Sequence, residues 1–266
     1  MRLAIVFPAH NEESRIGPTL DAYSTVCVDP ETRFFVALDD CTDRTEHVVR
    51  AHALSDPRVE LRRFPKLGKG GVIMEMFRSI DTDLLAFVDA DCATPPSELL
   101  RLADSVATGD VDGAIASRWH PAAVVPQQRR RALSRRIASV GFAHGVRRVF
   151  GLPYRDTQCG AKVFRRDAMD LLLPLLSSRD FLFDVDLLVT ARALGLRLRE
   201  VPTIWLDQQD SRLQAGRDGR RMAVSMLQLW LHHRVMPVRH PVAAYPDEPA
   251  EYPVAAPENE LVTHVH

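Results

Sequence analysis

The chain has 266 residues, of which 46% are hydrophobic, 26% charged and 7% aromatic, an ordinary composition for a globular protein that buries a sizeable core. Its 34 basic and 35 acidic residues give a net charge of -1, which excludes a generally basic coat for nucleic acid. The four cysteines form no CxxC pair and no apolar run reaches about 18 residues, so neither a zinc cage, a disulfide framework nor a membrane-spanning helix is predicted.

Apolar runs and helix signals alternate along the first half of the chain. The apolar runs predict strands at residues 3–7, 34–38, 59–64, 84–88 and 114–117. Helices are predicted between them, at about residues 13–26 and 42–53, and a third one follows the glycine-rich residues 68–71 and runs through residue 80. The run at 59–64 alternates polar and apolar residues and is expected at an edge of the sheet. This succession of strands and helices indicates an α/β fold with a mostly parallel sheet.

Polar residues follow three of these strands directly. Residues 8–12 (PAHNE) follow the first strand, Asp39 and Asp40 the second, and Asp89 with Asp91 the fourth. Because ligands of parallel sheets bind beyond the carboxyl ends of the strands, we predict that these residues surround a ligand site.

The residue types at these strand ends suit a phosphorylated ligand. Asp89 and Asp91 offer the hard oxygen ligands that Mg²⁺ and Mn²⁺ share with substrate phosphates. Asp39 and Asp40 either cap the next helix or accept hydrogen bonds from a base or ribose. Residues 68–71 (GKGG) lack the Walker A pattern, but a glycine-rich turn with a lysine at a helix start suits a diphosphate.

Charge is unevenly distributed along the chain. Residues 113–155 contain no acidic residue and nine arginines, at positions 118, 129, 130, 131, 135, 136, 147, 148 and 155. Such a segment either attracts an anionic partner or forms a solvated helix face. The proline-rich acidic residues 236–266 lack apolar periodicity and are expected to form a disordered or loosely docked tail after a domain at 1–235.

Eight motifs in a fixed order carry a family resemblance. They are PAHNEE with Arg15 and Ile16 (8–16), DDxxDxT (39–45), GKGG (68–71), VDADxAT (88–94), SR (117–118), DTQCGxKxF (156–164), FDVDLL (183–188) and EVPxxW (200–205). Together they resemble family-2 glycosyltransferases over about residues 2–235, and among these the dolichyl-phosphate β-glucosyltransferases and polyprenyl-phosphate mannose synthases. The resemblance implies a GT-A fold, a nucleotide-sugar donor, a divalent metal and inversion at the anomeric carbon.

The resemblance also implies roles for individual residues. Donor binding is expected from Pro8, Ala9, Asn11, Glu12, Asp40, Lys69, Asp89 and Ala90. Asp40 would accept a hydrogen bond from the edge of a uracil or guanine base. Lys69 would approach the diphosphate, and Asp89 and Asp91 would bind Mg²⁺ or Mn²⁺. Gln158 and Lys162 would lie near the donor sugar or the acceptor phosphate. Trp205 is either a platform for the sugar or a core residue.

The acceptor decides what further chemistry is needed. A polyprenyl phosphate is already anionic and needs cations, for which Arg118, Arg129, Arg130 and Arg131 are the candidates. A hydroxyl of a small molecule or nucleoside instead needs a carboxylate base, which would be Asp186 or secondarily Asp184. We expect transfer of a hexose from UDP-glucose or GDP-mannose to a polyprenyl phosphate. The alternatives are a soluble transferase with a hydroxyl acceptor and a non-catalytic nucleotide-sugar-binding protein.

Some features depart from the family pattern. Cys41 and Cys92 stand where relatives commonly have glycine, and Cys92 either tunes specificity or packs as a small apolar residue. Asp186 replaces the usual glutamate. Many relatives carry membrane helices at one terminus, and no such helix is predicted here. Residues 222–231, which follow three arginines, either lie in a lipid interface or face the core. We therefore expect a cytoplasmic protein, peripheral to the inner membrane face at most.

Overall fold

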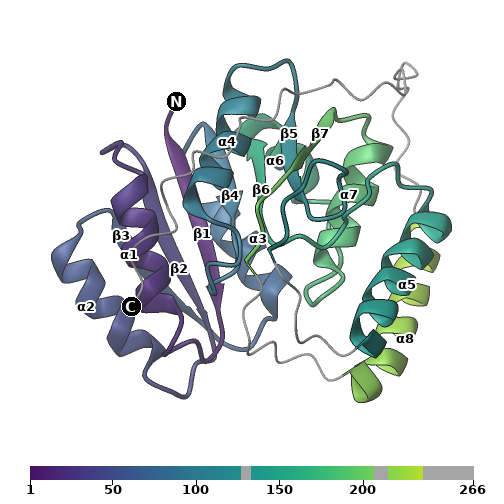
Figure 1. The fold of residues 1–266 in the computed structure, drawn as a ribbon, viewed down its shortest axis with the longest axis horizontal. Coiled ribbons are helices and arrows are strands. Elements are labelled where there is room, and N and C mark those ends of the chain that lie inside the picture. Colours follow the sequence, from purple (N-terminus) through teal and green to yellow (C-terminus); the bar gives the residue numbers. More distant parts are fainter. Residues whose placement is uncertain (127–132, 207–214, 236–266) are drawn as a thin grey trace.

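The computed structural model describes residues 1–126, 133–206 and 215–235, and within them one seven-stranded sheet forms the centre of the molecule (Figure 1). The strands are β1 (Leu3–Ala9), β2 (Arg33–Asp39), β3 (Val59–Phe64), β4 (Leu84–Phe87), β5 (Gly113–Ser117), β6 (Lys162–Arg165) and β7 (Leu198–Pro202). Their order across the sheet is β3-β2-β1-β4-β6-β5-β7, which confirms β3 as an edge strand.

The sheet is mostly parallel, as predicted. β1 runs parallel to β2 and β4, β2 to β3, and β5 to β7. β6 is antiparallel to both its neighbours, β4 and β5. β6 and β7 were not predicted, because neither contains a clear apolar run: the four residues of β6 have charged ends, and Arg199 and Glu200 interrupt the five residues of β7.

Helices cover both faces of the sheet. They are α1 (Ile16–Val26), α2 (Thr45–Ser55), α3 (Lys69–Ser79), α4 (Pro96–Ala107), α5 (Leu133–Phe150), α6 (Arg166–Leu172), α7 (Phe183–Ala193) and α8 (Ala215–Val235). Alternate residues of β1 point to opposite faces of the sheet. Ile5 and Phe7 pack with α1, α2 and α4 on one face, and Ala4 and Val6 pack with α3, α6 and α7 on the other. Both faces are therefore buried, which explains the continuous apolar runs in the sequence.

A third apolar cluster lies where α5 and α8 join the sheet. It contains Ile115 of β5, Val146 of α5, Val185 of α7 and Leu229 of α8. α5 and α8 lie side by side at one edge of the molecule (Figure 1). None of the helices in the described residues is long and apolar enough to cross a membrane.

The start of α3 is fixed by close contact with α7. A Cβ atom added at Gly70 would lie 2.4 Å from Cβ of Phe183, so only glycine allows α3 to approach α7 this closely. Gly68, just before the helix, has a φ of +80°. Two glycines of the GKGG motif thus bring Lys69 against the first turn of α7, where Asp184 lies.

Candidate active site

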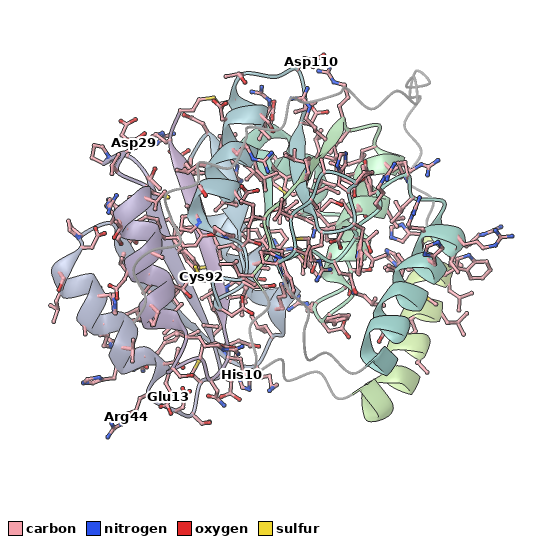
Figure 2. The ribbon with its side chains drawn as sticks, in the orientation of Figure 1. His10, Glu13, Asp29, Arg44, Cys92 and Asp110 are labelled. Carbon is pink, nitrogen blue, oxygen red and sulfur yellow. The ribbon has the colours of Figure 1, made fainter. Side chains whose placement is uncertain are left out.

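Backbone strain marks the carboxyl ends of three neighbouring strands. In the described residues the non-glycine residues with positive φ are Asn11 (58°), Asp40 (52°) and Cys92 (54°), which follow β1, β2 and β4. Such strain costs free energy and is concentrated at functional sites. Figure 2 shows His10 and Glu13, which follow β1, at the end of the molecule opposite Asp29 and Asp110. The strand ends predicted to bind a ligand do converge.

Two side chains tie the strand-end loops together. Oδ1 of Asn11 accepts a hydrogen bond from the Thr42 amide at 2.7 Å, which joins the loop after β1 to the loop after β2. The carboxylate of Asp39 accepts from the amides of Leu67 and Gly68 at 2.7 and 3.1 Å, which joins β2 to the turn before α3. Asp39 was not predicted to have this role, because its partners lie 28 and 29 residues away.

The other predicted donor residues lie in or beside these loops. The carboxylate of Glu12 accepts a hydrogen bond from Nε of Arg15 at 2.6 Å. Ala9 is buried, and its carbonyl accepts a hydrogen bond from the Cys41 thiol at 3.3 Å. The carboxylate of Asp40 is exposed and makes no hydrogen bond or ion pair with the described residues. It is therefore available to a ligand. Pro8 lies in β1, and Ala90 lies between the two aspartates that follow β4. The carbonyl of Ala90 accepts a hydrogen bond from the Thr19 hydroxyl at 2.9 Å.

Six charged side chains form a largely buried cluster beside the end of β4. We call this the charged cluster: Lys69, Asp89, Arg118, Asp156, Lys162 and Asp184. Nζ of Lys69 lies 2.8 Å from Oδ1 of Asp89 and 3.4 Å from Oδ2 of Asp184. Nζ of Lys162, which is fully buried, lies 2.5 Å from Oδ1 of Asp184 and donates to the Cys159 carbonyl at 2.7 Å. Acidic and basic side chains thus alternate in the order Asp89, Lys69, Asp184 and Lys162.

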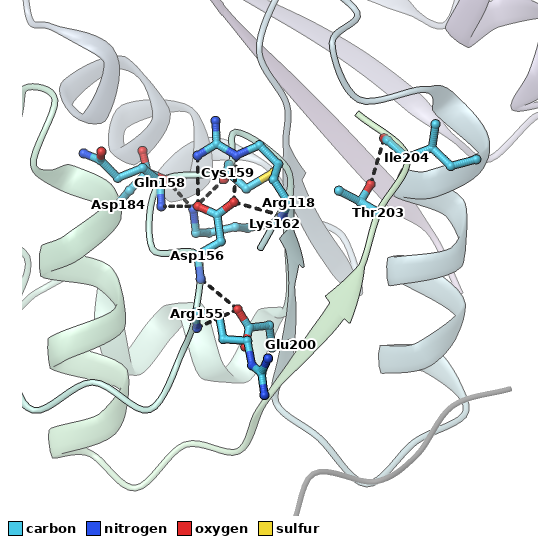
Figure 3. A network of polar contacts seen from close by, with 10 residues as sticks. All are labelled: Arg118, Arg155, Asp156, Gln158, Cys159, Lys162, Asp184, Glu200, Thr203 and Ile204. Carbon is cyan, nitrogen blue, oxygen red and sulfur yellow. Dashed lines mark hydrogen bonds and ion pairs between the residues drawn. The ribbon is translucent and has the colours of Figure 1, made fainter. Parts of the chain in front are cut away.

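Arg118 and Asp156 form the second part of the charged cluster (Figure 3). Nε and Nη2 of Arg118 donate to the two oxygens of Asp156 at 2.7 and 2.9 Å. Glu200 accepts from the amides of Arg155 and Asp156 at 2.8 Å each, which fixes this loop. Nε and Nη2 of Arg118 are thus engaged by Asp156, and Nη1 is not part of this ion pair.

Three buried polar atoms beside the Arg118–Asp156 pair have no hydrogen-bond partner in the described residues. They are Oγ of Ser117, Oγ1 of Thr157 and Nε2 of Gln158. Buried polar groups are normally paired, because an unpaired one costs about 1–3 kcal/mol. Their position, at the end of β5 and in the loop before β6, favours a ligand that supplies the missing partners.

The two carboxylates that follow β4 differ in their electrostatic environment. Burial acts to raise the pKa of Asp89, but Lys69 outweighs it and holds that pKa below its usual value. Burial and the nearby charge of Asp89 raise the pKa of Asp91. Asp91 has no such cationic partner in contact within residues 1–126, 133–206 and 215–235, so a cation placed beside it would relieve an unfavourable charge.

The residues after β4 fit a divalent metal. The Asp89 side chain is 44% exposed although it is ion-paired, and carboxylate oxygens are preferred ligands of Mg²⁺ and Mn²⁺. A Cβ at Gly160 would lie 1.9 Å from Oδ2 of Asp89, so the loop leaves room for this carboxylate. The described residues contain no group of three or more His, Cys, Asp and Glu side chains that could hold a metal. Oxygens of a substrate phosphate or of water are suited to complete such a site.

Substituting Gly160 should affect activity more than stability. Because an added Cβ collides with the Asp89 carboxylate, Gly160→Ala is expected to turn that side chain away and lower turnover by about tenfold or more, with a small change in melting temperature. Steady-state kinetics and thermal unfolding test this. Gly145→Ala is the control, because a Cβ there meets no atom within 4 Å. Equal activity of the two variants would contradict the prediction.

Asp186 lies outside the charged cluster. Its Oδ2 accepts from the amides of Ser177 and Ser178 at 2.7 Å each, and its Oδ1 lies 2.8 Å from Nε2 of His233 on α8. Burial acts to raise its pKa, but these hydrogen bonds hold the pKa below its usual value. With both oxygens occupied and no exposure, Asp186 is a poor base. We assign it instead the role of holding α8 against α7.

Trp205 and Cys92, for which the sequence left two alternatives, both pack inside the protein. Trp205 is only 9% exposed and lies beneath the Arg118 guanidinium, 5.5 Å from ring centroid to Cζ, which favours the core alternative. Cys92 packs against the apolar cluster on one face of the sheet. Arg129, Arg130 and Arg131 lie outside the described residues, as does the tail at 236–266.

Comparison with known proteins identifies relatives for most of the chain. A family model described as "Glycosyl transferase family 2" matches residues 4–173. Glycosyltransferase AglD of Haloferax volcanii is 29% identical over 242 residues, which make up 89% of this chain and 38% of AglD. A dolichyl-phosphate beta-glucosyltransferase of Trichomonas vaginalis is 31% identical over 242 residues, which make up 86% of this chain and 71% of that protein.

A solved structure is similar in fold. It is glucosyl-3-phosphoglycerate synthase of Mycobacterium tuberculosis in complex with Mn²⁺, UDP and glucosyl-3-phosphoglycerate, with a TM-score of 0.62 and 18% identity. The match covers 86% of this chain and 79% of that structure. At this identity the likeness concerns the fold alone.

Proposed function

The chain belongs to glycosyl transferase family 2 and has the expected GT-A fold, and we propose that it transfers a hexose from a nucleotide sugar to a polyprenyl phosphate. The observation that carries this proposal is the Lys69–Asp89 ion pair, with Asp91 beside it, at the carboxyl ends of the strands. The related protein of Trichomonas vaginalis, named for glucosyl transfer to dolichyl phosphate, supports the choice of acceptor.

The donor would be bound by the strand-end loops. Asp40 offers a free, exposed carboxylate to the edge of a uracil or guanine base. Asp89 and Asp91 would hold Mg²⁺ or Mn²⁺, and Lys69 would bind the diphosphate. When bound, such an ion neutralises negative charge on the departing nucleoside diphosphate. The Mn²⁺ and UDP in the structurally similar synthase complex support this assignment.

The contacts of the two candidate bases favour a phosphate acceptor over a hydroxyl acceptor. Asp184 is paired with two lysines, and both oxygens of Asp186 are hydrogen-bonded. Neither carboxylate is placed to remove a proton, and a phosphate monoester needs no such help. Nη1 of Arg118 and the unpaired Nε2 of Gln158 are donors that would suit its oxygens.

α8 also presents an apolar surface suited to a membrane. Its exposed residues Val224 (55%), Leu227 (56%), Leu231 (46%) and Val235 (76%) share one side of the helix, opposite the buried Leu229. The residues of α5 and α8 include one acid, Asp218, and eight arginines, at positions 135, 136, 147, 148, 217, 220, 221 and 234. The apolar stripe, together with the eight arginines and single acid in the sequences of these two helices, favours peripheral binding to an anionic bilayer at its cytoplasmic face.

Polar substitutions in this stripe should weaken membrane binding. Leu227→Gln combined with Leu231→Gln is expected to lower binding to phosphatidylcholine vesicles containing phosphatidylglycerol by about tenfold, because two half-exposed leucines no longer enter the bilayer. Cosedimentation measures the change. Leu171→Gln, at a similarly exposed leucine of α6, is the control. Undiminished vesicle binding by the double variant would remove α8 from the membrane contact.

Substrate identity can be tested with a crossed panel. UDP-glucose, UDP-galactose and GDP-mannose are each combined with a polyprenyl phosphate or with soluble hydroxyl acceptors, and the products are read by mass spectrometry. The proposal expects a hexosyl polyprenyl phosphate from one donor, with dependence on Mg²⁺ or Mn²⁺. Transfer only to soluble hydroxyls would replace the acceptor proposed here. Binding of a nucleotide sugar without transfer to any acceptor would contradict the enzymatic function.

A further inference from the structure

Lys69 forms an ion pair with Asp89, the carboxylate proposed to bind the metal. Its Nζ lies 2.8 Å from Oδ1 of Asp89 and also 3.4 Å from Oδ2 of Asp184. It therefore stands between two acids, one at the end of β4 and one in the first turn of α7. Its side chain is 25% exposed and keeps Nζ within 5.7 Å of the Phe87 ring centroid. The lysine is thus at the border between the charged cluster and solvent.

The two acids differ in how firmly they are held. The Asp184 side chain is 5% exposed and bound on its other oxygen by Lys162, which is itself fully buried and anchored on the Cys159 carbonyl. The Asp89 side chain is 44% exposed. Lys69 can therefore release Asp89 and remain paired with Asp184, whereas release of Asp184 would leave a buried acid with one partner fewer.

The charge balance of the site disfavours a metal bound alone. The charged cluster holds three cations and three anions, and Asp91, close by, has no cation in contact among the residues that the structure describes. A divalent ion on Asp89 would lie beside the ammonium of Lys69 in a partly buried site, where like charges repel strongly. A diphosphate that arrives with the ion supplies the negative charge needed to offset both.

We propose that Lys69 is an internal counter-ion that occupies Asp89 until a nucleoside diphosphate arrives and then moves from Asp89 to the diphosphate, with Asp184 as its fixed second partner. This inference rests on the proposed function for its ligand. It makes metal binding and nucleotide binding cooperative, because the nucleotide draws away the lysine that blocks the metal ligand. The coupling would discourage metal binding in the absence of donor.

The test compares Mn²⁺ affinity with and without nucleotide. In the full-length protein, electron paramagnetic resonance of free Mn²⁺ is titrated alone, with UDP and with GDP. We expect wild-type protein to bind Mn²⁺ at least about tenfold more tightly with the matching nucleotide. Lys69→Met should bind Mn²⁺ alone about tenfold more tightly than wild type, and the gain from nucleotide should shrink.

Two further variants separate the charge of Lys69 from other effects. Lys69→Arg keeps the charge and should keep Mn²⁺ binding weak in the absence of nucleotide. Lys66→Met removes an exposed cation three residues earlier that is not paired with Asp89 and should change Mn²⁺ affinity little. Thermal unfolding of each variant checks that the protein is folded.

The outcomes distinguish this inference from the proposed function. Mn²⁺ affinity of Lys69→Met that equals or falls below that of wild type, in the absence of nucleotide, would overturn the counter-ion role. Failure of the crossed panel to yield a glycosylated product would overturn the proposed function instead, and the Mn²⁺ titration without nucleotide would still decide the role of Lys69.

Discussion

Asp89→Asn is expected to lower hexose transfer by about 10²–10³-fold while leaving the protein folded. Asparagine has nearly the same shape but lacks the charge that a divalent ion and Lys69 require. The side chain is 44% exposed, so the loss of its ion pair with Lys69 costs little stability in water. Steady-state turnover in the presence of Mn²⁺ measures the effect, and circular dichroism checks the fold.

Asp81→Asn provides the matched control for this prediction. Asp81 is also an exposed aspartate paired with a cation, Arg2 at 3.6 Å, but it precedes β4, whereas Asp89 follows it. Its substitution should leave transfer unchanged. If Asp89→Asn retained more than about half of the wild-type rate, the strand-end carboxylates would not be part of the catalytic machinery.

The strand ends were predictable from sequence because both signals there are local. The apolar run of β4 and the acids that follow it lie within eight residues, and parallel strands bring such ends together whatever the rest of the fold does. Helix α3 and its lysine were likewise signalled by four consecutive residues. What the sequence could not show is that Asn11, Asp40 and Cys92 adopt strained backbone conformations.

The ionic partners could not be predicted, because they are distant in sequence. The segment without acids ends at Arg155. Arg118, which lies inside this segment, is nevertheless ion-paired with Asp156, the first residue after it. An arginine within an acid-free run of the sequence therefore need not be free of acidic partners in the fold. Asp186 illustrates the same limit, since its motif suggested a base and only the fold shows its hydrogen bonds to Ser177 and Ser178.

Lys162→Met is expected to lower the free energy of unfolding by about 3–5 kcal/mol. Lys162 is fully buried and lies 2.5 Å from Asp184, whose side chain is 5% exposed. Without Lys162, Lys69 at 3.4 Å is the one ion-pair partner left to the Asp184 carboxylate in the described part of the chain, so the free-energy cost of burying this charge is no longer offset. Urea unfolding followed by circular dichroism measures the change, and an unaltered m-value would show that the denatured state is the same.

The double variant Lys162→Met with Asp184→Leu tests whether the cost comes from the unpaired charge. Two apolar side chains in place of a buried ion pair are often neutral or stabilising, so the double variant should be more stable than Lys162→Met alone by about 2 kcal/mol or more. Equal destabilisation by the double and single variants would mean that packing around Lys162, rather than the charge left on Asp184, sets the cost. Because Lys69 would then lack its fixed partner, the double variant should also lose transfer activity although its stability recovers. Recovery of stability without recovery of activity would separate the two tasks of the charged cluster, which are to neutralise buried charge and to hold Lys69 beside Asp89.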